Sequence, residues 1–420
     1  MPSFRLLIAQ IAVILIVARF VGWLFRKLHQ PHVIGEMVAG ILLGPSLLGW
    51  IAPTISAALF PPASLGSLNS LSQIGLLLFM FLVGLELDLK QLRELGRAAI
   101  ITSQASILAP FILGFLLAVY LYPRVSDPSV NFTGFALFMS IAMSITAFPV
   151  LARILAERDL LRTKVGALAI ACAAVNDVTA WCILAGIVVL VRASGLPLPL
   201  WMTLAGLGVF LLVMLFVVKP SLRKLVTLFE KRGMLTHDSL ALILLLTLAA
   251  GWVTESLGLH ALFGAFLAGV IMPRHREFTH EIWQRLESLT VVLLLPLYFA
   301  FTGLRSSFLL IVGQGMWGYF LVIFALAVVG KFGGSLAAAK VSGLSWREAA
   351  AVGVLMNTRG LVELIILNVG LDLGVLSPAL FSVMVLMALV TTFMTSPLLR
   401  WIYPDWMANQ ARLTPTEAAK

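Results

Sequence analysis

The residues Ala171–Trp181 read ACAAVNDVTAW, and they set an asparagine, Asn176, beside an aspartate, Asp177, in an otherwise apolar stretch. No charged residue other than Asp177 occurs between Lys164 and Arg192. Such a stretch is long enough to cross a bilayer as a helix, for which about 20 residues suffice. A charge near the middle of a membrane helix costs at least about 2.5–3.5 kcal/mol, so Asp177 should have a partner or a use.

The composition of the whole chain agrees with a membrane location. Of its 420 residues, 60% are hydrophobic and 11% are charged, whereas soluble proteins carry about 25% charged residues. The sequence therefore predicts an all-α polytopic membrane protein with about thirteen transmembrane helices. The expected spans are residues 4–25, 33–52, 67–87, 98–122, 132–156, 165–192, 199–218, 237–256, 259–273, 288–304, 315–339, 347–370 and 377–401.

The Lys and Arg residues are unevenly shared between the two sides of this arrangement. One set of alternate loops holds most of them, and the other holds only Arg5, Arg124, Arg192 and Arg305. Because positively charged loops stay inside, we expect an N-terminus outside and a cytoplasmic C-terminus in an inner or plasma membrane. The same bias, with attraction to the lipid bilayer, accounts for the net charge of +10 without a nucleic acid partner. No phosphate loop, nucleophile triad or metal-ligand cluster is present, so neither an enzyme nor a cofactor is expected.

Two expected spans are interrupted at mid-depth. The fifth reads SITAFPVLARIL (residues 144–155), with Pro149 in its middle, and the twelfth reads GVLMNTRGLVELI (residues 353–365), with Gly360 in its middle. Broken helices survive in a membrane only against protein or a water-filled cavity. In corresponding positions of two halves they indicate the binding site of a secondary transporter. By span order the two run antiparallel, which suggests an inverted repeat.

The remaining polar groups at this depth have open interpretations. Lys331, in VVGKFGGS, pairs either with Asp177 or with the negative ends of half-helices. Arg359 and Glu363 lie four residues apart and form either a structural pair or part of a gate. A carboxylate can hold a proton or a dehydrated cation but not both, which makes Asp177 the expected ion-binding residue, with Asn176 as a neutral ligand. Further oxygen ligands, or caps of the broken ends, are expected from Thr146, Asn357 and Thr358.

Several segments together resemble a known family. TAFPVLARILAERDLL, AAVNDVTAW, VVGKFGGS and MNTRGLVELIILNVG are similar to the signature segments of the second monovalent cation:proton antiporter family. This family includes plant cation/H+ exchangers and the Kef-type and Nap-type bacterial antiporters. PHVIGEMVAGILLGPSLLG resembles one of the family's early spans, so the likeness covers almost the whole chain.

The resemblance implies a thirteen-span inverted-repeat fold, a homodimer, and an Asp177 that binds cation and proton in turn near two crossed broken helices, with Lys331 beside it. It also implies a division of the chain. Residues 1–97 and 237–312 would hold dimerisation helices, 98–192 and 313–402 core helices, 193–236 a linker, and 403–420 a short cytoplasmic tail.

The chain departs from the family pattern at two points. Many sodium-selective members have two adjacent aspartates where this chain has Asn176 and Asp177, so charge stoichiometry and sodium preference do not carry over. Kef-type and plant members also have a large soluble C-terminal domain, whose control is not expected here. We expect a K+ or Na+/H+ antiporter, and the alternative is a gated potassium efflux channel on the same scaffold. A sodium-coupled solute symporter would need more polar groups in the membrane.

Overall fold

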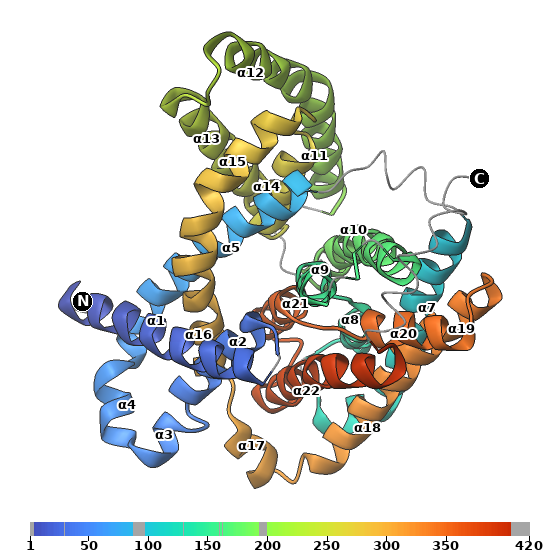
Figure 1. Ribbon diagram of the computed structural model, residues 1–420. Helices are drawn as coiled ribbons and strands as arrows, with labels where there is room; N and C mark the ends of the chain where they lie inside the picture. The colour runs from blue at the N-terminus through green and yellow to red at the C-terminus, as the bar shows by residue number, and fades with distance from the viewer. Residues whose placement is uncertain are drawn as a thin grey trace. The chain divides into compact units, whose positions relative to one another are not determined.

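The computed structural model of the protein describes residues 4–28, 30–86, 97–128, 130–158, 160–161, 163–192 and 200–404, with the side chains of residues 97, 98, 157, 192 and 200 left aside. Every regular element within these ranges is helical (Figure 1). The expected tail from residue 405 onward lies outside the described residues, as does the start of the expected linker, residues 193–199.

Eleven helices in the described ranges are long and apolar enough to cross a membrane. A twelfth crossing is formed by α20 (Trp346–Met356) and α21 (Leu361–Asp372), which are bent by 41° at the break between them. The predicted class, an all-helical polytopic membrane protein, is confirmed. The count is one below thirteen because the expected span at 259–273 contains only α14 (Ala261–Val270), whose 10 residues are about half of a membrane crossing.

The chain divides into two compact units, of which the first comprises residues 1–15, 57–89 and 185–301. Within it, α14 packs along α5 and against α13. The core of this unit includes Phe81, Leu225 and Phe278, all buried. Its elements are α5 (Pro62–Glu86), α11 (Leu200–Val213), η1 (Met214–Val218), α12 (Lys219–Arg232), α13 (His237–Ser256), α14, α15 (Arg276–Leu289) and η2 (Thr290–Leu294).

The second unit comprises residues 16–56, 90–184 and 302–420. Its elements are α2 (His32–Leu43), α3 (Leu48–Ile51), α7 (Arg97–Val125), α8 (Phe132–Ser144), α9 (Phe148–Glu157), α17 (Phe308–Gly313), α18 (Trp317–Val328), η3 (Val329–Gly333), α19 (Gly334–Val341), α20, α21 and α22 (Pro378–Ile402). Four helices cross the unit boundaries: α1 (Phe4–Lys27), α4 (Pro53–Leu59), α10 (Lys164–Arg192) and α16 (Leu295–Arg305). The helix pairs α8–α9 and α20–α21 form the two predicted broken spans.

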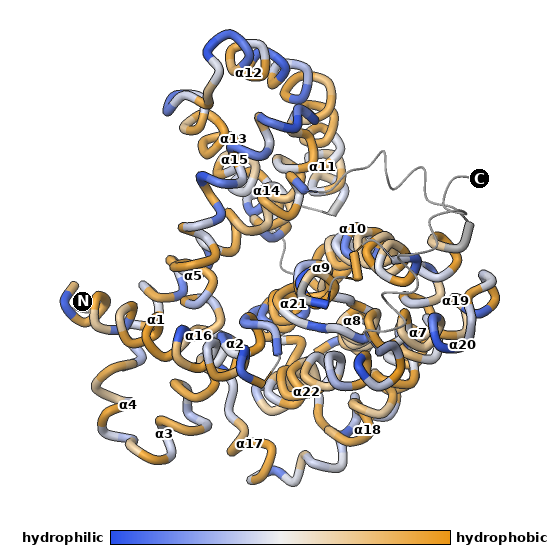
Figure 2. The backbone as a smooth tube through the Cα atoms, viewed as in Figure 1, coloured by the Kyte–Doolittle hydropathy of each residue, from blue (hydrophilic) through white to orange (hydrophobic). Residues whose placement is uncertain are grey.

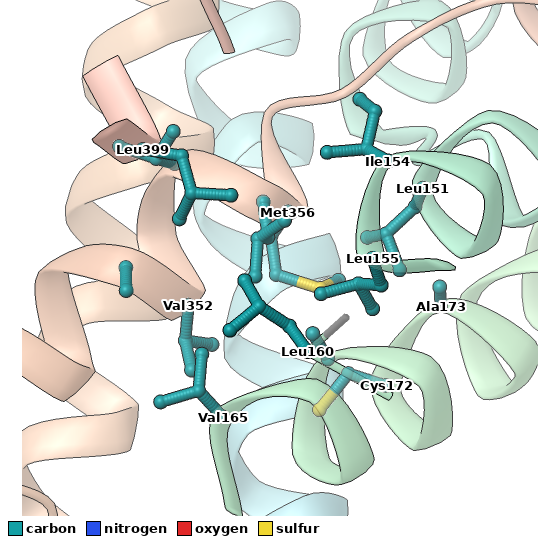
Figure 3. Packing of buried hydrophobic residues seen from close by; sticks show 14 of the residues in the cluster. Leu151, Ile154, Leu155, Leu160, Val165, Cys172, Ala173, Val352, Met356 and Leu399 are labelled. Atoms are coloured by element: carbon teal, nitrogen blue, oxygen red, sulfur yellow. The ribbon is translucent and has the colours of Figure 1, made fainter. Parts of the chain in front are cut away.

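A buried apolar cluster fixes the broken helices from one side (Figure 3). The apolar residues of α9 recur at spacings of three and four, which places them on one face of the helix. The cluster joins Leu151, Ile154 and Leu155 of α9 to Cys172 and Ala173 of α10, Val352 and Met356 of α20, and Leu399 of α22. Because these side chains are almost completely buried, the cluster holds α9 and α20 in a fixed position beside α10.

Candidate functional site

The two broken helices cross at their breaks. Helix α8 ends at Ser144 and α9 begins at Phe148, while α20 ends at Met356 and α21 begins at Leu361. The hydroxyl of Thr146 donates a hydrogen bond to the Met356 carbonyl oxygen at 2.8 Å. The backbone N–H of Ala147 donates to the Thr358 carbonyl oxygen at 2.9 Å. The freed backbone groups of each break are thus satisfied in part by the other break, as a membrane interior requires.

Local sequence explains where each helix is interrupted. Pro149 lies in the first turn of α9, where its missing N–H and fixed φ angle are tolerated. Gly360 precedes α21 and comes close to α9, because a Cβ at this position would lie 2.7 Å from Cγ2 of Val150. The structure therefore places both breaks at the positions suggested by the sequence, and Gly360 permits their close approach.

Two buried basic side chains, Lys331 and Arg359, cap the end of α8. Lys331, on the π-helical segment η3, donates hydrogen bonds from Nζ to the carbonyl oxygens of Ser144 and Ser106. The guanidinium of Arg359 donates to the carbonyl oxygens of Ala142 and Met143, each at 2.7 Å. The last carbonyls of a helix have no partner within the helix and carry partial negative charge. Three consecutive carbonyls of α8 are therefore satisfied by Lys331 and Arg359.

Arg359 also forms an ion pair within its own helix region. Its Nη1 lies 2.8 Å from Oε2 of Glu363, and both side chains are fully buried. The backbone N–H of Arg359 donates to the hydroxyl of Thr392 in α22 at 3.0 Å. These contacts tie the break of α20–α21 to α8 and α22.

Asn176 forms hydrogen bonds with Thr146, an expected site residue, and with two serines that were not predicted to take part. Its Nδ2 donates to the hydroxyl of Thr146 at 3.1 Å and to that of Ser106 at 3.0 Å. Its Oδ1 accepts from the hydroxyl of Ser103 at 3.2 Å. Serine in a membrane helix commonly bonds to a carbonyl of its own helix, so nothing in the sequence marked Ser103 and Ser106 as partners of α10. The Asn176 amide links α7, α10 and the break of α8–α9.

Asp177 has no such partners. Its side chain is 3% exposed, and neither carboxylate oxygen has a hydrogen-bond partner of ordinary geometry among the described residues. The backbone N–H of Phe148, at the start of α9, lies near the carboxylate. No salt bridge joins Asp177 to Lys331 among the described side chains. A buried carboxylate without a hydrogen-bond partner requires an explanation such as a bound ion, water or proton.

Two more oxygens at the crossing also lack partners. Oδ1 of Asn357 and Oγ1 of Thr358 are buried and form no hydrogen bond to any residue that the structure describes. They lie near Asp177 through two neighbouring backbone groups. The N–H of Ala147 donates to the Thr358 carbonyl, and the N–H of the next residue, Phe148, lies near the Asp177 carboxylate. The crossing thus presents two carboxylate oxygens, one amide oxygen and one hydroxyl, all of them ligand types suited to a hard cation.

The chain was compared with known proteins. Residues 14–402 match the family described as sodium/hydrogen exchanger, transmembrane. The chain is 40% identical over 400 residues to the Na(+)/H(+) antiporter NhaS4 of Synechocystis sp., with 95% of this chain and 97% of that protein covered. It is 44% identical over 399 residues to the cation/H(+) antiporter 17 of Arabidopsis thaliana. The K(+)/H(+) antiporter 1 of Saccharomyces cerevisiae is 34% identical over 422 residues.

The chain spans about half the length of the last two proteins, 48% of each, while they cover 95% and 98% of it. Among solved structures, the sodium proton antiporter MjNhaP1 of Methanocaldococcus jannaschii matches with a TM-score of 0.65 and 16% identity. That match covers 96% of this chain and 98% of the other. It shows that the two share a fold.

Proposed function

The chain belongs to the sodium/hydrogen exchanger family, and on that premise we propose that it exchanges K+ or Na+ for H+ by alternating access, with cation and proton competing for Asp177. The observation that carries this proposal is the pair of buried, unpartnered carboxylate oxygens at the crossing of two broken helices. Relatives named for Na+/H+ and for K+/H+ exchange support the reaction and leave both cations as candidates.

Charge at the site favours competition between the two ligands. The buried charged groups that act on one another around the crossing are Asp177, Glu363, Lys331 and Arg359, and their charges sum to zero when all four are ionised. Either one proton or one monovalent cation at Asp177 brings the sum to +1. Binding of both would place a second uncompensated charge in a buried site, which is costly. We therefore propose that one cation is exchanged for one proton, so that transport moves no net charge.

The neighbouring residues take different roles in this proposal. Asn357 and Thr358 supply the oxygens that complete the cation's ligand set, because their oxygens are buried and unpartnered. Asn176 and Thr146 act as positioning residues, because their polar atoms already bond to one another, to Ser106 and to Met356. Lys331, Arg359 and Glu363 stabilise the end of α8 and the break beside it.

The proposed membrane, orientation and assembly of the protein rest on the charge distribution and on the family resemblance. We place the protein in an inner or plasma membrane with the N-terminus outside and the C-terminus cytoplasmic, on the strength of the Lys and Arg bias between loops. A homodimer, with dimerisation helices in residues 1–97 and 237–312 and core helices in 98–192 and 313–402, is part of the same proposal. An inverted repeat relating α8–α9 to α20–α21 would provide the two access states.

Proton flux into proteoliposomes tests the proposal. The protein is reconstituted with an internal pH dye, and K+, Na+ or Li+ is added outside. A cation should drive proton movement in the wild type and not in Asp177→Asn. The matched control is Asp372→Asn, which removes a carboxylate of α21 that is 45% exposed and paired with Arg305, and it should retain exchange. Cation flux without coupled proton movement, or full activity of Asp177→Asn, would replace the antiporter by the channel.

A further inference from the structure

Helix α12 carries five basic side chains in 14 residues, Lys219, Arg223, Lys224, Lys231 and Arg232. All five are exposed, and the helix is prominent in blue in Figure 2. Its one acidic residue, Glu230, lies 3.6 Å from Nε2 of His275 and so is directed toward the start of α15. The proposed transport reaction uses none of these residues.

The apolar face of α12 is already covered by its own unit. Leu222, Leu225 and Phe229 are buried in the core of the first unit. The ring of Phe229 packs edge-on against Phe278, with ring centroids 5.6 Å apart. Since this face is occupied, α12 has no apolar stripe left to insert into a bilayer, and only its charged face is available to a partner.

The element that precedes α12 places this charged face at a membrane surface. The helix from Trp201 to Arg232 is continuous over 32 residues, or about 48 Å at 1.5 Å per residue, against about 30 Å of hydrocarbon. The side chains of Phe216 and Val217, in η1, are 72% and 59% exposed and apolar. Lys219 is the first residue after η1, so the change from exposed apolar to charged side chains occurs within two residues of Val217.

We propose that the exposed face of α12, with the neighbouring exposed Arg276 of α15, binds the phosphate groups of anionic phospholipids in the adjacent leaflet. Four to eight basic residues directly beyond a transmembrane helix are the pattern that attracts an anionic lipid surface. The charges extend along four helical turns rather than around a pocket, which matches a row of head groups better than one free phosphate. A second copy of the chain would bring like charges together on this face, so it is not the favoured occupant.

The test compares lipid retention in charge variants. Purified protein is equilibrated with equal amounts of phosphatidylglycerol and phosphatidylcholine, and native mass spectrometry counts the lipids that stay bound. The wild type should prefer phosphatidylglycerol, and added salt should weaken the preference. The variant Arg223→Gln/Lys224→Gln/Lys231→Gln/Arg232→Gln should lose that preference by tenfold or more, since each basic residue contributes about fivefold.

Three further samples make the result specific. Arg223→Lys/Arg232→Lys keeps the charge and should keep the preference. Lys224→Gln/Lys231→Gln serves if the fourfold variant does not fold, and it should lose part of the preference. Lys164→Gln/Lys340→Gln/Arg347→Gln/Arg400→Gln removes the same charge from the second unit and should lose much less of the preference than the fourfold α12 variant.

Three outcomes would overturn the proposal. In the first, the fourfold α12 variant binds phosphatidylglycerol as the wild type does. In the second, the second-unit variant loses as much phosphatidylglycerol binding as the fourfold α12 variant. Alternatively, the α12 variants could change the oligomeric state of the protein and leave lipid binding intact, which would assign this face to a second copy of the chain.

Discussion

The ammonium group of Lys331 donates a hydrogen bond to the carbonyl oxygen of Ser144, the last residue of α8. This contact satisfies a carbonyl that the helix itself leaves free, and it draws Lys331 toward the helix end rather than into a salt bridge with Asp177. The carboxylate of Asp177 consequently keeps both of its oxygens without a hydrogen bond. The arrangement separates the group that stabilises the broken helix from the group proposed to bind ions.

Replacing Lys331 should therefore lower stability. Lys331→Met keeps most of the length of the side chain and leaves the Ser144 and Ser106 carbonyls buried without this donor, at about 1–3 kcal/mol for each group. We expect a fall of several degrees in the melting temperature of the purified protein. Lys164→Met, at an exposed position, should melt as the wild type does. Unchanged melting with an altered cation affinity would show that Lys331 acts on Asp177 instead.

Gly360→Ala should disturb the crossing. The added methyl group would lie 2.7 Å from Cγ2 of Val150, so α9 or α21 must shift, and overpacking of this kind costs about 1–3 kcal/mol. We expect a lower exchange rate and a lower melting temperature. The second substitution Val150→Ala should restore part of both. Gly333→Ala has open space around its Cβ and is the control; an equal loss there would rule out the clash as the cause.

Thr358→Val should weaken cation binding. The substitution keeps the shape of the side chain and removes a hydroxyl that forms no hydrogen bond within the described part of the chain, so little stability should be lost. A hydrogen-bonding group that meets a charge contributes about 1.5–3 kcal/mol, which predicts a rise of about tenfold or more in the KM for the cation. Thr391→Val removes a hydroxyl that bonds only within α22, and its KM should match the wild type.

Asn176→Asp should make transport sensitive to membrane potential. A second carboxylate at the crossing would change the sum of buried charges from zero to −1, so that the site can hold two protons in exchange for one cation, and each cycle would then move net charge. We expect a potential-sensitive dye to report charge movement with this variant and none with the wild type. The substitution also removes the two donors to Thr146 and Ser106, so a lower melting temperature should accompany it. Charge movement by the wild type would contradict one-for-one exchange.

Much of the fold could be predicted from the sequence. Long apolar runs specify the membrane helices because burial in lipid depends on composition and length alone. Pro149 and Gly360 mark the two breaks because each acts on its own stretch of backbone. The expected span at 259–273 is the exception, since apolar composition does not reveal that α14 is only 10 residues long and packs against α5 and α13.

The candidate site could be predicted only in part. The high cost of a charge in a membrane singled out Asp177, Lys331, Arg359 and Glu363 one by one. The local spacing also suggested the pair of Arg359 with Glu363, four residues apart. The hydrogen bonds of Ser103 and Ser106 to Asn176 were not predicted, because they depend on the position of α7 beside α10.

The sequence by itself determined that this chain lies in a membrane, where its helices break and which charges are buried, because each of these follows from residues that are neighbours along the chain. The tertiary structure alone decided the partners of those charges. Lys331 reaches a carbonyl 187 residues away, and Arg359 one that is 217 residues away. Such pairings depend on how helices pack, and that packing is what leaves Asp177 as the buried acidic side chain at the crossing with both oxygens unpartnered among the described residues.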